Sequence, residues 1–578
     1  MATTTQAVEA VHRMPFGAEV VPGGVRFRLW APGAEQVHLQ VNDRHLEMQA
    51  GGDGWFERLE ASAGPGTLYR YRIDGELAVP DPASRFQPQD VDGPSEVIDP
   101  AAFRWDDGGW RGRPWNEAVV YELHAGTFTP SGKYSGINEK LDHLKRLGVT
   151  ALELMPLADF AGGRNWGYDG VLPYAPDSVY GRPEELKALV QAAHRAGLMV
   201  FLDVVYNHFG PKGNYLHSYA PQFFTERHKT PWGAAIDFTN RWVREYFINN
   251  ALYWLREYRF DGLRFDAVHA IHDDSPEHVL FALAKKIREA LENDRHIHLV
   301  LENDANQARY LQSYTAQWND DSHHGYHVLA TNESDGYYAA YADAPAKHLA
   351  RSLAEGFAYQ GEVSPFSNEP RGEPSKHLPP TAFVDFMQNH DQVGNRAMGE
   401  RLSVLTQEHK LEALTAVLLL APSPPLLFMG EEWGCRQPFL FFCDFPGELG
   451  EAVRKGRREE FARFAAFQDR KARERIPDPL AESTFRQCVL DWQQAHGRRL
   501  ELYRALLDIR AREIAPRQFP AGSYDMLGKR AFRVRWGGLT LVANCGDQAV
   551  RVQAPAGRAL WSNGEPGQPW TVGWWISG

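Results

Sequence analysis

Positions 262–270 read GLRFDAVHA and place Arg264 two residues before Asp266 in a segment that alternates like a β-strand. Side chains two residues apart on a strand share a face, so the guanidinium and the carboxylate should lie side by side. A structural ion pair would explain this arrangement. A carboxylate held ionised for nucleophilic attack would explain it equally well, because a neighbouring cation favours the charged form of an acid.

Two further acidic residues end apolar, strand-like segments later in the chain. Glu302 lies in HLVLENDAN, and Asp391 lies in TAFVDFMQNHDQ. If these strands are parallel members of one barrel, their carboxyl ends meet on the face where such barrels hold their active sites. We therefore expect Asp266, Glu302 and Asp391 to converge. A purely structural role explains any one of these acids, but it explains all three poorly.

Three converging carboxylates suit the cleavage of a glycosidic bond with retention. That reaction needs an ionised carboxylate as nucleophile and a protonated carboxyl as acid, about 5–5.5 Å apart. The two pKa values must differ so that only one group is charged at the working pH. Asp266 beside Arg264 fits the nucleophile, and Glu302, with fewer cations around it, fits the acid. Asp391 would grip ring hydroxyls and favour a distorted sugar.

Other polar and aromatic residues near these strand ends would line the same site. Asp203, in DVVYNH at the end of the preceding strand, could hold Arg264 in place. The remaining candidates are three histidines and two aromatic residues: His208, His269, His390, Trp166 and Tyr168. The histidines raise a metal site as an alternative, but no HxxxH or HxH spacing supports it. We therefore predict neither a metal nor a cofactor.

The elements that must position these residues divide the chain into three parts. Residues 1–98 carry short alternating strands such as GVRFRLWAP, separated by turn residues, and predict an immunoglobulin-like β-sandwich. Residues 99–515 alternate strand-like and helical segments, which indicates parallel strands with crossover helices. Residues 516–578 return to a β pattern and predict a small antiparallel domain.

The middle part predicts the α/β fold of a (β/α)8 barrel, enlarged by inserted loops. Its strand segments are AVVYELHAG, VTALELMPL, LMVFLDVVYNH, GLRFDAV, HLVLEND, TAQWND, TAFVDFMQNHD and PLLFMGEEW. A doubly wound open sheet is the structural alternative. No glycine-rich dinucleotide-binding turn follows the first strand, which weighs against that alternative.

The composition of the chain indicates which classes of ligand and which cellular compartment to expect. The chain has 578 residues and a formal net charge of −12, which argues against nucleic acid as a ligand. The opening MATTTQAVEAVHRM does not have the pattern of a secretory signal, and no apolar run is long enough for a membrane span. Four cysteines show neither metal-type nor disulfide-type spacing, so we expect a cytoplasmic protein. The 17 Trp and 22 Tyr favour a carbohydrate ligand, because aromatic faces stack on sugar rings.

Four segments resemble the ordered signature regions of the α-amylase superfamily, glycoside hydrolase family 13. They are DVVYNH, GLRFDAVHA, LENDAN and FVDFMQNHDQ, and both their order and their spacing agree with that superfamily. The resemblance implies that Asp266 is the nucleophile, Glu302 the acid/base and Asp391 the transition-state stabiliser. It also implies a carbohydrate-module-like sandwich before the barrel and a β domain after it.

Finer features resemble the maltooligosyltrehalose trehalohydrolase family within that superfamily. The stretches are YELHAGTFT, MPLADFAGGRNWGYDG, FLDVVYNHFGPKGNYL, WNDDSHH, FMQNHDQVGNR and LLFMGEEW. The resemblance implies hydrolysis of the α-1,4 bond next to the terminal trehalose of maltooligosyltrehalose, which releases trehalose and a maltooligosaccharide. It implies a maltooligosyltrehalose synthase as the metabolic partner. Members usually carry Phe where this chain has Ser322.

The segment WNDDSHH should lie at the end of the sixth barrel strand, beside the barrel mouth. A polyhydroxylated disaccharide needs a dense lining of donors and acceptors, which this segment offers. We therefore expect four of its residues to bind the trehalose end: Asp320, Asp321, His323 and His324. A solvated acidic turn is the alternative. Tyr168 resembles an aromatic platform under the sugar on the non-leaving side, with a core tyrosine as the alternative, and His269 resembles a residue that faces the leaving sugar.

Two other functions stay open at the level of sequence. The first is a glycogen branching enzyme, which shares the N-terminal sandwich and similar WGYD and NHD stretches but transfers the glycosyl group to a sugar hydroxyl instead of water. The second is a glycan-binding protein on an inactive barrel. The presence of all three carboxylates weighs against the second function.

Overall fold

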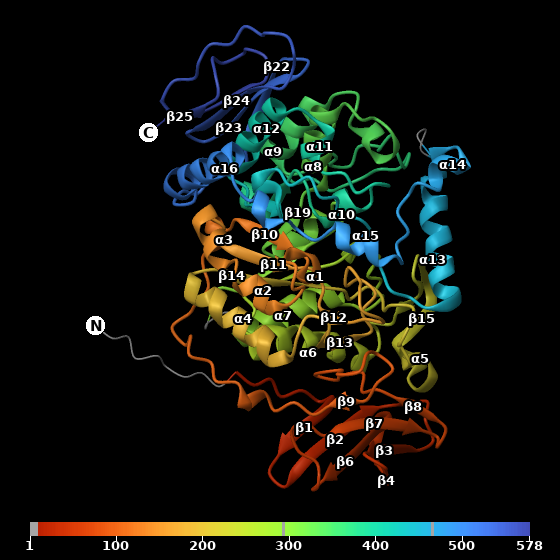
Figure 1. The fold of residues 1–578 in the computed structure, drawn as a ribbon. Helices are drawn as coiled ribbons and strands as arrows, with labels where there is room; N and C mark the ends of the chain where they lie inside the picture. Colours follow the sequence, from red (N-terminus) through yellow and green to blue (C-terminus); the bar gives the residue numbers. More distant parts are fainter. Residues whose placement is uncertain (1–9, 292–294, 464–466, 578) are drawn as a thin grey trace.

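The computed structural model describes residues 10–291, 295–463 and 467–577. Its centre is a closed barrel of parallel strands, which confirms the predicted fold class (Figure 1). In order around the barrel the strands are β10 (Val120–Leu123), β11 (Ala151–Leu154), β14 (Met199–Val204), β17 (Gly262–Phe265), β18 (His298–Leu301), β19 (Ala316–Trp318), β20 (Phe383–Phe386) and β21 (Pro425–Phe428). Each lies within one of the predicted strand segments.

Helices cover the barrel, so its strands are enclosed on both faces and read as nearly continuous apolar runs. Every residue of β14 is buried, for example. The helices between successive strands are α1 (Ala125–Phe128), α2 (Tyr134–Asn138), α3 (Leu141–Leu147), α4 (Pro183–Ala196), α5 (Leu216–Tyr219), α6 (Arg241–Glu257), α7 (Val279–Leu291), α8 (Asp320–Thr331), α9 (Pro345–Glu355), α10 (His390–Gly394), α11 (Leu402–Leu405) and α12 (Glu408–Leu420). After β21 come α13 (Gly447–Glu460), α14 (Arg470–Arg473), α15 (Glu482–Gln487) and α16 (Arg498–Ile509).

Helix α4 illustrates why the sequence folds this way. Leu186, Leu189, Val190 and Ala193 recur at helical spacing and are buried against the barrel. The helix ends at Gly197, whose φ of 83° is left-handed and costs little in a residue without a Cβ.

Excursions from this plan lie at the carboxyl ends of the strands, where the site is expected. One pair of strands, β12 (Ala158–Asp159) and β13 (Leu172–Pro176), follows β11. A second hairpin, β15 (Phe224–Thr230) and β16 (Gly233–Ile236), follows β14. A third excursion runs from α8 through α9 to β20 and includes the loop at 361–372. These insertions enlarge the barrel as predicted.

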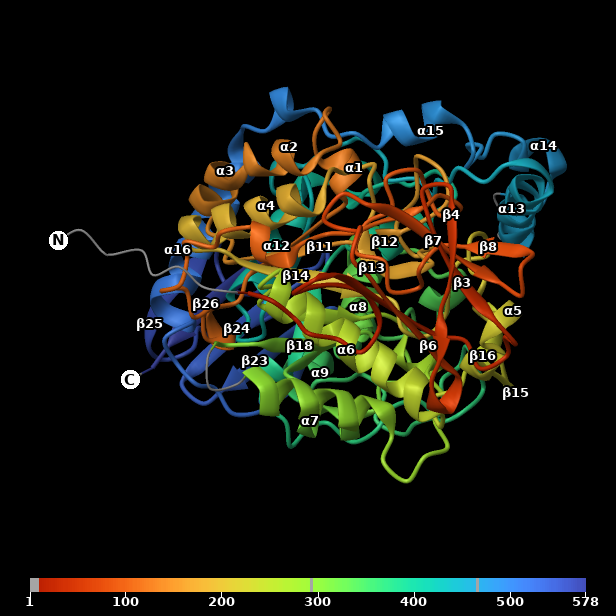
Figure 2. The same cartoon turned by 90° about the horizontal axis from the view of Figure 1, so that it is seen from below.

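The N-terminal sandwich consists of two antiparallel sheets at one end of the molecule (Figures 1 and 2). One sheet holds β1 (Gly17–Val21), β2 (Gly24–Trp30), β5 (Gln49–Ala50) and β6 (Trp55–Glu60). The other holds β3 (Val37–Val41), β4 (Arg44–Glu47), β7 (Leu68–Ile73), β8 (Leu77–Val79) and β9 (Ser95–Glu96). Val25, Phe27 and Leu29 of β2 are buried between the sheets, as their alternation predicts.

The sandwich is joined to the barrel by a buried cluster of charged residues. Arg85, which lies between β8 and β9, is 3.4 Å from Glu257 at the end of α6. Lys187 of α4 contacts the same carboxylate at 3.5 Å, and Arg85 also donates to the backbone oxygen of Ala18 at 2.8 Å. An aromatic contact between Trp55 and Trp242 adds to this interface.

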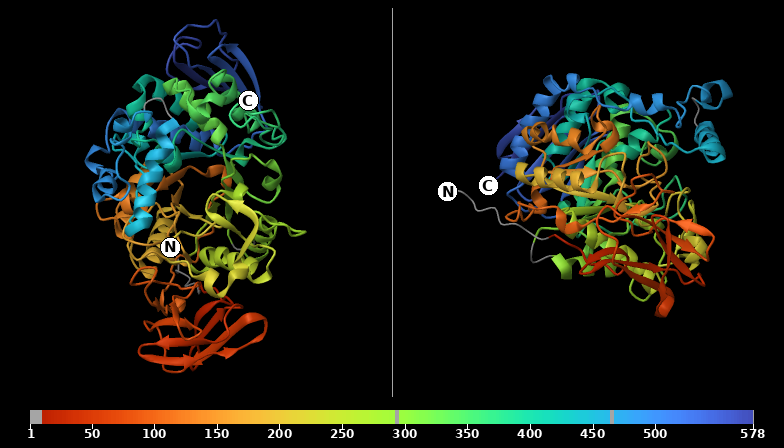
Figure 3. Two further views of the ribbon diagram at one scale, coloured as in Figure 1. Left: turned by 90° about the vertical axis from the view of Figure 1, so that its right-hand side faces the viewer. Right: turned by 60° about the horizontal axis from the view of Figure 1, so that its bottom comes forward.

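The C-terminal sheet caps the opposite end of the molecule (Figure 3). Its strands are β22 (Ser523–Gly528), β23 (Ala531–Trp536), β24 (Leu539–Asn544), β25 (Arg558–Ser562) and β26 (Thr571–Ile576). Trp536 donates to the Leu353 oxygen of α9 at 3.0 Å, and Trp574 donates to the Ala416 oxygen of α12 at 2.9 Å. Within the described residues, no helix combines the length and apolar character needed to cross a membrane.

The Glu257 cluster predicts a large loss of stability on substitution. Glu257→Ala leaves Arg85 and Lys187 buried without their carboxylate partner, which should cost about 3–5 kcal/mol of folding free energy. The matched control is Asp525→Ala, which breaks the exposed pair with Arg535 and should cost less than about 1 kcal/mol. Calorimetric Tm values of the two variants give the comparison. Equal Tm values would contradict the structural importance of the cluster.

Candidate active site

A buried guanidinium organises the carboxyl ends of β14 and β17. Arg264 Nη1 donates to both oxygens of Asp203 at 2.9 and 2.7 Å, and to Asp266 Oδ1 at 2.7 Å. The guanidinium carbon also lies 4.1 Å from the ring centroid of Trp318 in β19. The side-by-side arrangement expected for Arg264 and Asp266 is therefore present, and Asp203 holds the arginine from the neighbouring strand.

Glu302 lies directly after β18, within reach of the same guanidinium at 3.7 Å. Its Oε2 accepts a hydrogen bond from the backbone N–H of Ala267 at 2.5 Å. Ala267 has a left-handed φ of 41°, an uncommon conformation for a residue with a Cβ, directly after Asp266. The turn thus ties Glu302 to the strand that carries Asp266.

The surroundings of Glu302 favour its protonated form. Burial raises the pKa of Glu302 well above its ordinary value, and the negative charges of Asp266, Asp320 and Asp391 add to this effect against the pull of Arg264. A carboxyl group that keeps its proton near neutral pH can act as a general acid. Asp266, by contrast, accepts a close hydrogen bond from the Arg264 guanidinium at 2.7 Å.

His390 and Asp391 begin the short helix α10 on a third side of the site. Asp391 is exposed, and its Oδ1 accepts a hydrogen bond from Asn395 at 2.5 Å. His390 Nδ1 lies 2.5 Å from Glu122 Oε1, and its backbone N–H donates to Glu122 Oε2 at 2.9 Å. Burial opposes the charged imidazole, but Glu122 outweighs it and raises the pKa of His390. Sequence analysis missed Glu122, although a glutamate in the apolar strand AVVYELHAG was a usable signal.

Aromatic residues form a wall beside these groups. Tyr168 stacks on His390 with ring centroids 5.0 Å apart, and its hydroxyl donates to Asp203 Oδ2 at 2.6 Å. Trp166 packs edge-on against His390 at 5.7 Å. Tyr168 is part-exposed and packs against the main hydrophobic core.

His208 lies under an exposed indole that sequence analysis missed. Its Nε2 lies 2.9 Å from the backbone oxygen of Tyr168. Trp232, between the strands of the β15–β16 hairpin, stacks on the imidazole at 4.4 Å and is 48% exposed. Trp232 lies between the signature segments DVVYNH and GLRFDAVHA, and its position depends on the β15–β16 hairpin, which the sequence did not predict.

The DDSHH residues form the first turn of helix α8, so the alternative of a solvated acidic turn is wrong. Asp320 and His324 line the cleft. Asp321 and His323 do not: both are buried behind the cleft wall, and His323 Nδ1 lies 2.8 Å from the Met387 backbone oxygen. For these two residues the expected direct contact with a sugar is therefore corrected. Ser322 is buried as well and donates to the Asn319 backbone oxygen at 2.8 Å.

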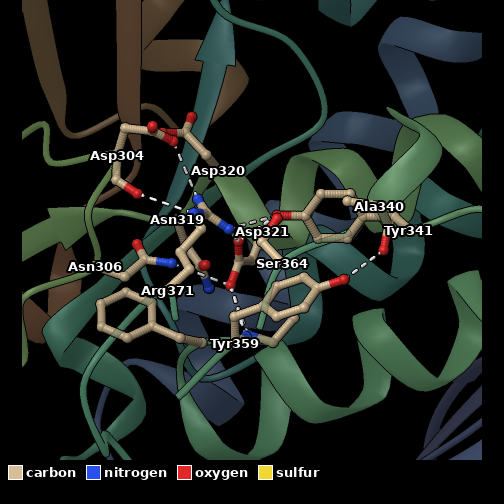
Figure 4. Close-up of polar contacts among 12 residues, drawn as sticks. Asp304, Asn306, Asn319, Asp320, Asp321, Ala340, Tyr341, Tyr359, Ser364 and Arg371 are labelled. Carbon is tan, nitrogen blue, oxygen red and sulfur yellow. Dashed lines mark hydrogen bonds and ion pairs between the residues drawn. The ribbon is translucent and has the colours of Figure 1, made fainter. Parts of the chain in front are cut away.

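Asp321 is instead the centre of a hydrogen-bond network (Figure 4). Its carboxylate is 0% exposed and accepts from the Tyr341 hydroxyl at 2.5 Å, from the Ala358 backbone N–H at 2.7 Å and from Arg371. Arg371 holds the pKa of Asp321 below its usual range, although burial works in the opposite direction. This role was not predicted, because Arg371 lies fifty residues further along the chain in an irregular segment.

Arg371 also connects this network to the strand that carries Glu302. Its Nη2 lies 3.1 Å from Asp304 Oδ1, and its Nε donates to the Asp304 backbone oxygen at 3.0 Å. The backbone N–H of Asp304 in turn donates to His269 Nδ1 at 3.3 Å, which places the exposed His269 on the same side. Arg371, Asp304 and His269 therefore lie together on the side of the site next to Glu302, the candidate acid.

A cleft of about 380 Å³ opens beside Glu302 and Asp391. It is lined by three of the acidic residues around the predicted reaction centre, Glu302, Asp320 and Asp391, and by Arg264. Further lining comes from Asp304, His324, Tyr341, Phe366 and Arg371. Among the described residues no group of three or more His, Cys, Asp or Glu side chains is arranged to hold a metal ion. The cleft offers acid–base chemistry on a polyhydroxylated ligand.

Three family models match parts of the chain. Residues 84–232 match the catalytic domain of α-amylase. Residues 15–100 match carbohydrate-binding module 48, the isoamylase N-terminal domain, and residues 521–574 match a domain of unknown function, DUF3459.

Similar proteins cover most of the chain. A malto-oligosyltrehalose trehalohydrolase from Deinococcus radiodurans is 46% identical over 86% of this chain and 83% of its own length. One from Saccharolobus solfataricus is 40% identical over 86% of this chain and 87% of its own length. A crystal structure of a candidate α-amylase from Salmonella typhimurium superposes with a TM-score of 0.93 at 47% identity, over 98% of this chain and all of that one.

The environment of Glu302 predicts the pH dependence of catalysis. An acid must be protonated to act, so kcat/KM should fall as the pH rises through the raised pKa of Glu302. Asp320→Asn removes one negative charge that raises this pKa, so the basic limb of the profile should move to lower pH. Asp343→Asn, at an exposed position outside the cleft, is the control and should leave the limb in place. An unmoved limb in Asp320→Asn would contradict the assignment of the acid.

Proposed function

Because the chain belongs to the malto-oligosyltrehalose trehalohydrolase family of the α-amylase superfamily, we propose that it cleaves the α-1,4-glucosidic bond next to the terminal trehalose of maltooligosyltrehalose. The products are trehalose and a maltooligosaccharide shortened by that unit. The protein is thus a glycoside hydrolase. The observation that carries the proposal is the polar chamber beyond Glu302, which is built to receive a hydroxyl-rich leaving group.

The reaction proceeds by double displacement with retention. Asp266, held by Arg264, attacks the anomeric carbon while Glu302 donates its proton to the glycosidic oxygen, and trehalose leaves. Glu302 then removes a proton from water, which displaces Asp266 from the anomeric carbon and releases the maltooligosaccharide. Asp391 binds the hydroxyls of the reacting ring and favours its distortion. His390, whose pKa is raised by Glu122, lies beside it.

The leaving disaccharide occupies the chamber lined by Asp304, Asp320, His324, Tyr341 and Arg371. Carboxylates accept hydrogen bonds from sugar hydroxyls, and the guanidinium donates to them. Burial raises the pKa of Asp320 to about 7, so this residue offers both a donor and an acceptor form near neutral pH. On the opposite side, Tyr168 and Trp232 border the reacting sugar and the chain attached to it.

A branching enzyme has less support. A 1,4-α-glucan branching enzyme from Streptomyces coelicolor is 33% identical over only 42% of this chain and 36% of its own length. The hydrolase also implies a partner, a maltooligosyltrehalose synthase that supplies the substrate. We place both enzymes in the cytoplasm, in keeping with four buried cysteines that are all free thiols.

Product analysis tests the proposed function. Maltotriosyltrehalose should yield trehalose and maltotriose. Maltopentaose should be cut far more slowly, because a maltose leaving group would form fewer contacts with the chamber than trehalose does. Chromatography separates the products. Equal cutting of both substrates would indicate a general α-amylase, and new branch linkages on amylose would indicate a branching enzyme.

Removal of the nucleophile should abolish turnover with the fold intact. Asp266→Asn should lose roughly four or more orders of magnitude in kcat, as key catalytic groups do. Asp142→Asn, on the exposed surface of α3, should retain full kcat. The measurement is kcat on maltotriosyltrehalose, with Tm as a check on folding. A turnover within tenfold of the parent enzyme would refute the role of Asp266.

A further inference from the structure

The aromatic side chains of the N-terminal sandwich are all buried. Within the described residues 10–98 every Phe, Tyr and Trp side chain is at most 7% exposed: Phe16, Phe27, Trp30, Trp55, Phe56, Tyr69, Tyr71 and Phe86. A sugar can stack on an aromatic ring only where a face of that ring is open to solvent. Although residues 15–100 match carbohydrate-binding module 48, these rings therefore offer no platform for a glucan, and the two tryptophans make a different contact.

That contact is with the excursion of the barrel between β14 and α6, beside which the sandwich lies (Figures 1 and 2). Trp30 at the end of β2 lies 5.5 Å, between ring centroids, from Phe223, which directly precedes β15. Trp55 at the start of β6 lies 5.2 Å from Trp242, which follows β16. The Asp237 N–H donates to the Phe223 oxygen at 2.8 Å and closes the base of the β15–β16 hairpin. The sandwich therefore packs against the excursion both before and after the hairpin.

Polar contacts hold the same excursion at two further points. The Gly33 N–H of the sandwich donates to the Tyr219 oxygen at 2.8 Å. A Cβ at Gly33 would lie 3.0 Å from that oxygen and 3.1 Å from Pro221 Cδ, so the two segments approach as closely as a glycine allows. Asp92, between β8 and β9, accepts a hydrogen bond from the Tyr215 hydroxyl at 2.6 Å. The base of the hairpin is thus fixed to the N-terminal part of the chain.

The hairpin held in this way carries Trp232, which stacks on His208 with ring centroids 4.4 Å apart. Elsewhere in the hairpin, His228 lies 3.0 Å from Asp274 in a pair whose side chains are 32% and 50% exposed. Ion pairs open to water contribute little to stability. The direction in which the hairpin leaves the barrel therefore depends mainly on its base, which the sandwich contacts.

We propose that the N-terminal sandwich is a positioning domain for the β15–β16 hairpin, and that Trp30 and Gly33 are positioning residues that determine where Trp232 meets the glucan chain of the substrate. The inference rests on the proposed function, in which Trp232 borders the sugars attached to the reacting unit. A shift at the base is transmitted along the paired strands to the indole. The sandwich thereby contributes to substrate affinity without touching a sugar.

Steady-state kinetics on maltotriosyltrehalose tests the proposal. Gly33→Ala places a methyl group against the Tyr219 oxygen and Pro221 Cδ, so the hairpin base must shift by a few tenths of an ångström. KM should rise about three- to tenfold, the range that one aromatic contact supplies. Its kcat should stay within about twofold, because the contact is the same in the ground and transition states. Trp30→Leu should act in the same direction. Gly64→Ala is the matched control, since a Cβ there meets nothing within 4 Å, and should match the parent enzyme.

A double-mutant cycle with Trp232→Ala separates positioning from a general loss of stability. If the sandwich acts through the hairpin, Gly33→Ala should raise KM in the parent enzyme but cause no further rise once the indole is gone. A variant that only loosens the fold would raise KM in both backgrounds. Tm values of all variants are measured alongside as a check on folding.

Three results would overturn the proposal. The first is an unchanged KM in Gly33→Ala, and the second is a rise of equal size with and without Trp232. The third is an equal rise in Gly33→Ala and Gly64→Ala, which would mean that any substitution in the sandwich has this effect. Failure of the proposed function is visible separately, since the unsubstituted enzyme would then release no trehalose from maltotriosyltrehalose.

Discussion

The site depends on a single buried cation. A guanidinium removed from water is tolerated only where carboxylates neutralise it and hydrogen bonds satisfy its donors. Arg264 is neutralised by Asp203 on one neighbouring strand and by Asp266 at the end of its own, and its guanidinium lies against the Trp318 ring. The strand register of the barrel places these groups together, because Asp203 and Arg264 are direct partners between β14 and β17. The register of the barrel strands therefore also places the nucleophile beside its cationic partner.

The same arrangement separates the roles of the two reacting carboxyl groups. Asp266 takes the close hydrogen bond from the guanidinium, while Glu302 is left at a longer distance and surrounded by negative charge. The protonated form is therefore favoured at Glu302, whose pKa is raised, whereas Asp266 has the cation as its close partner. The left-handed Ala267 fixes their relation, since its N–H binds Glu302 directly after Asp266. The uncommon backbone conformation of Ala267 thus aligns the side chains of Asp266 and Glu302, which come from different strands.

The sequence predicted the parts of this structure that depend on short-range pattern. Strand segments, the three-part layout and the contact of Arg264 with Asp266 all follow from periodicity of two and from the rule that parallel barrels place polar residues at strand ends. Prediction from the sequence failed for side-chain contacts between residues that are far apart in the chain. Asp321 was expected to touch sugar and is enclosed, because only the fold brings Arg371 and Tyr341 to it. Trp232 was missed for the same reason: its partner, His208, belongs to another segment.

The hydrogen-bonded loop at 361–372 comes from the excursion between α9 and β20, whereas the bond-breaking groups come from β17, β18 and the start of α10. Its attachment to the reaction centre runs through one arginine that pairs with two aspartates. The segment proposed to contact the departing sugar is therefore separate from the strands that carry the catalytic carboxyl groups. Descendants of this barrel could exchange the excursion, provided that the arginine and its acceptors are kept, and acquire a different leaving group without altering the nucleophile or the acid. Selection can act on what the enzyme releases separately from how it cuts.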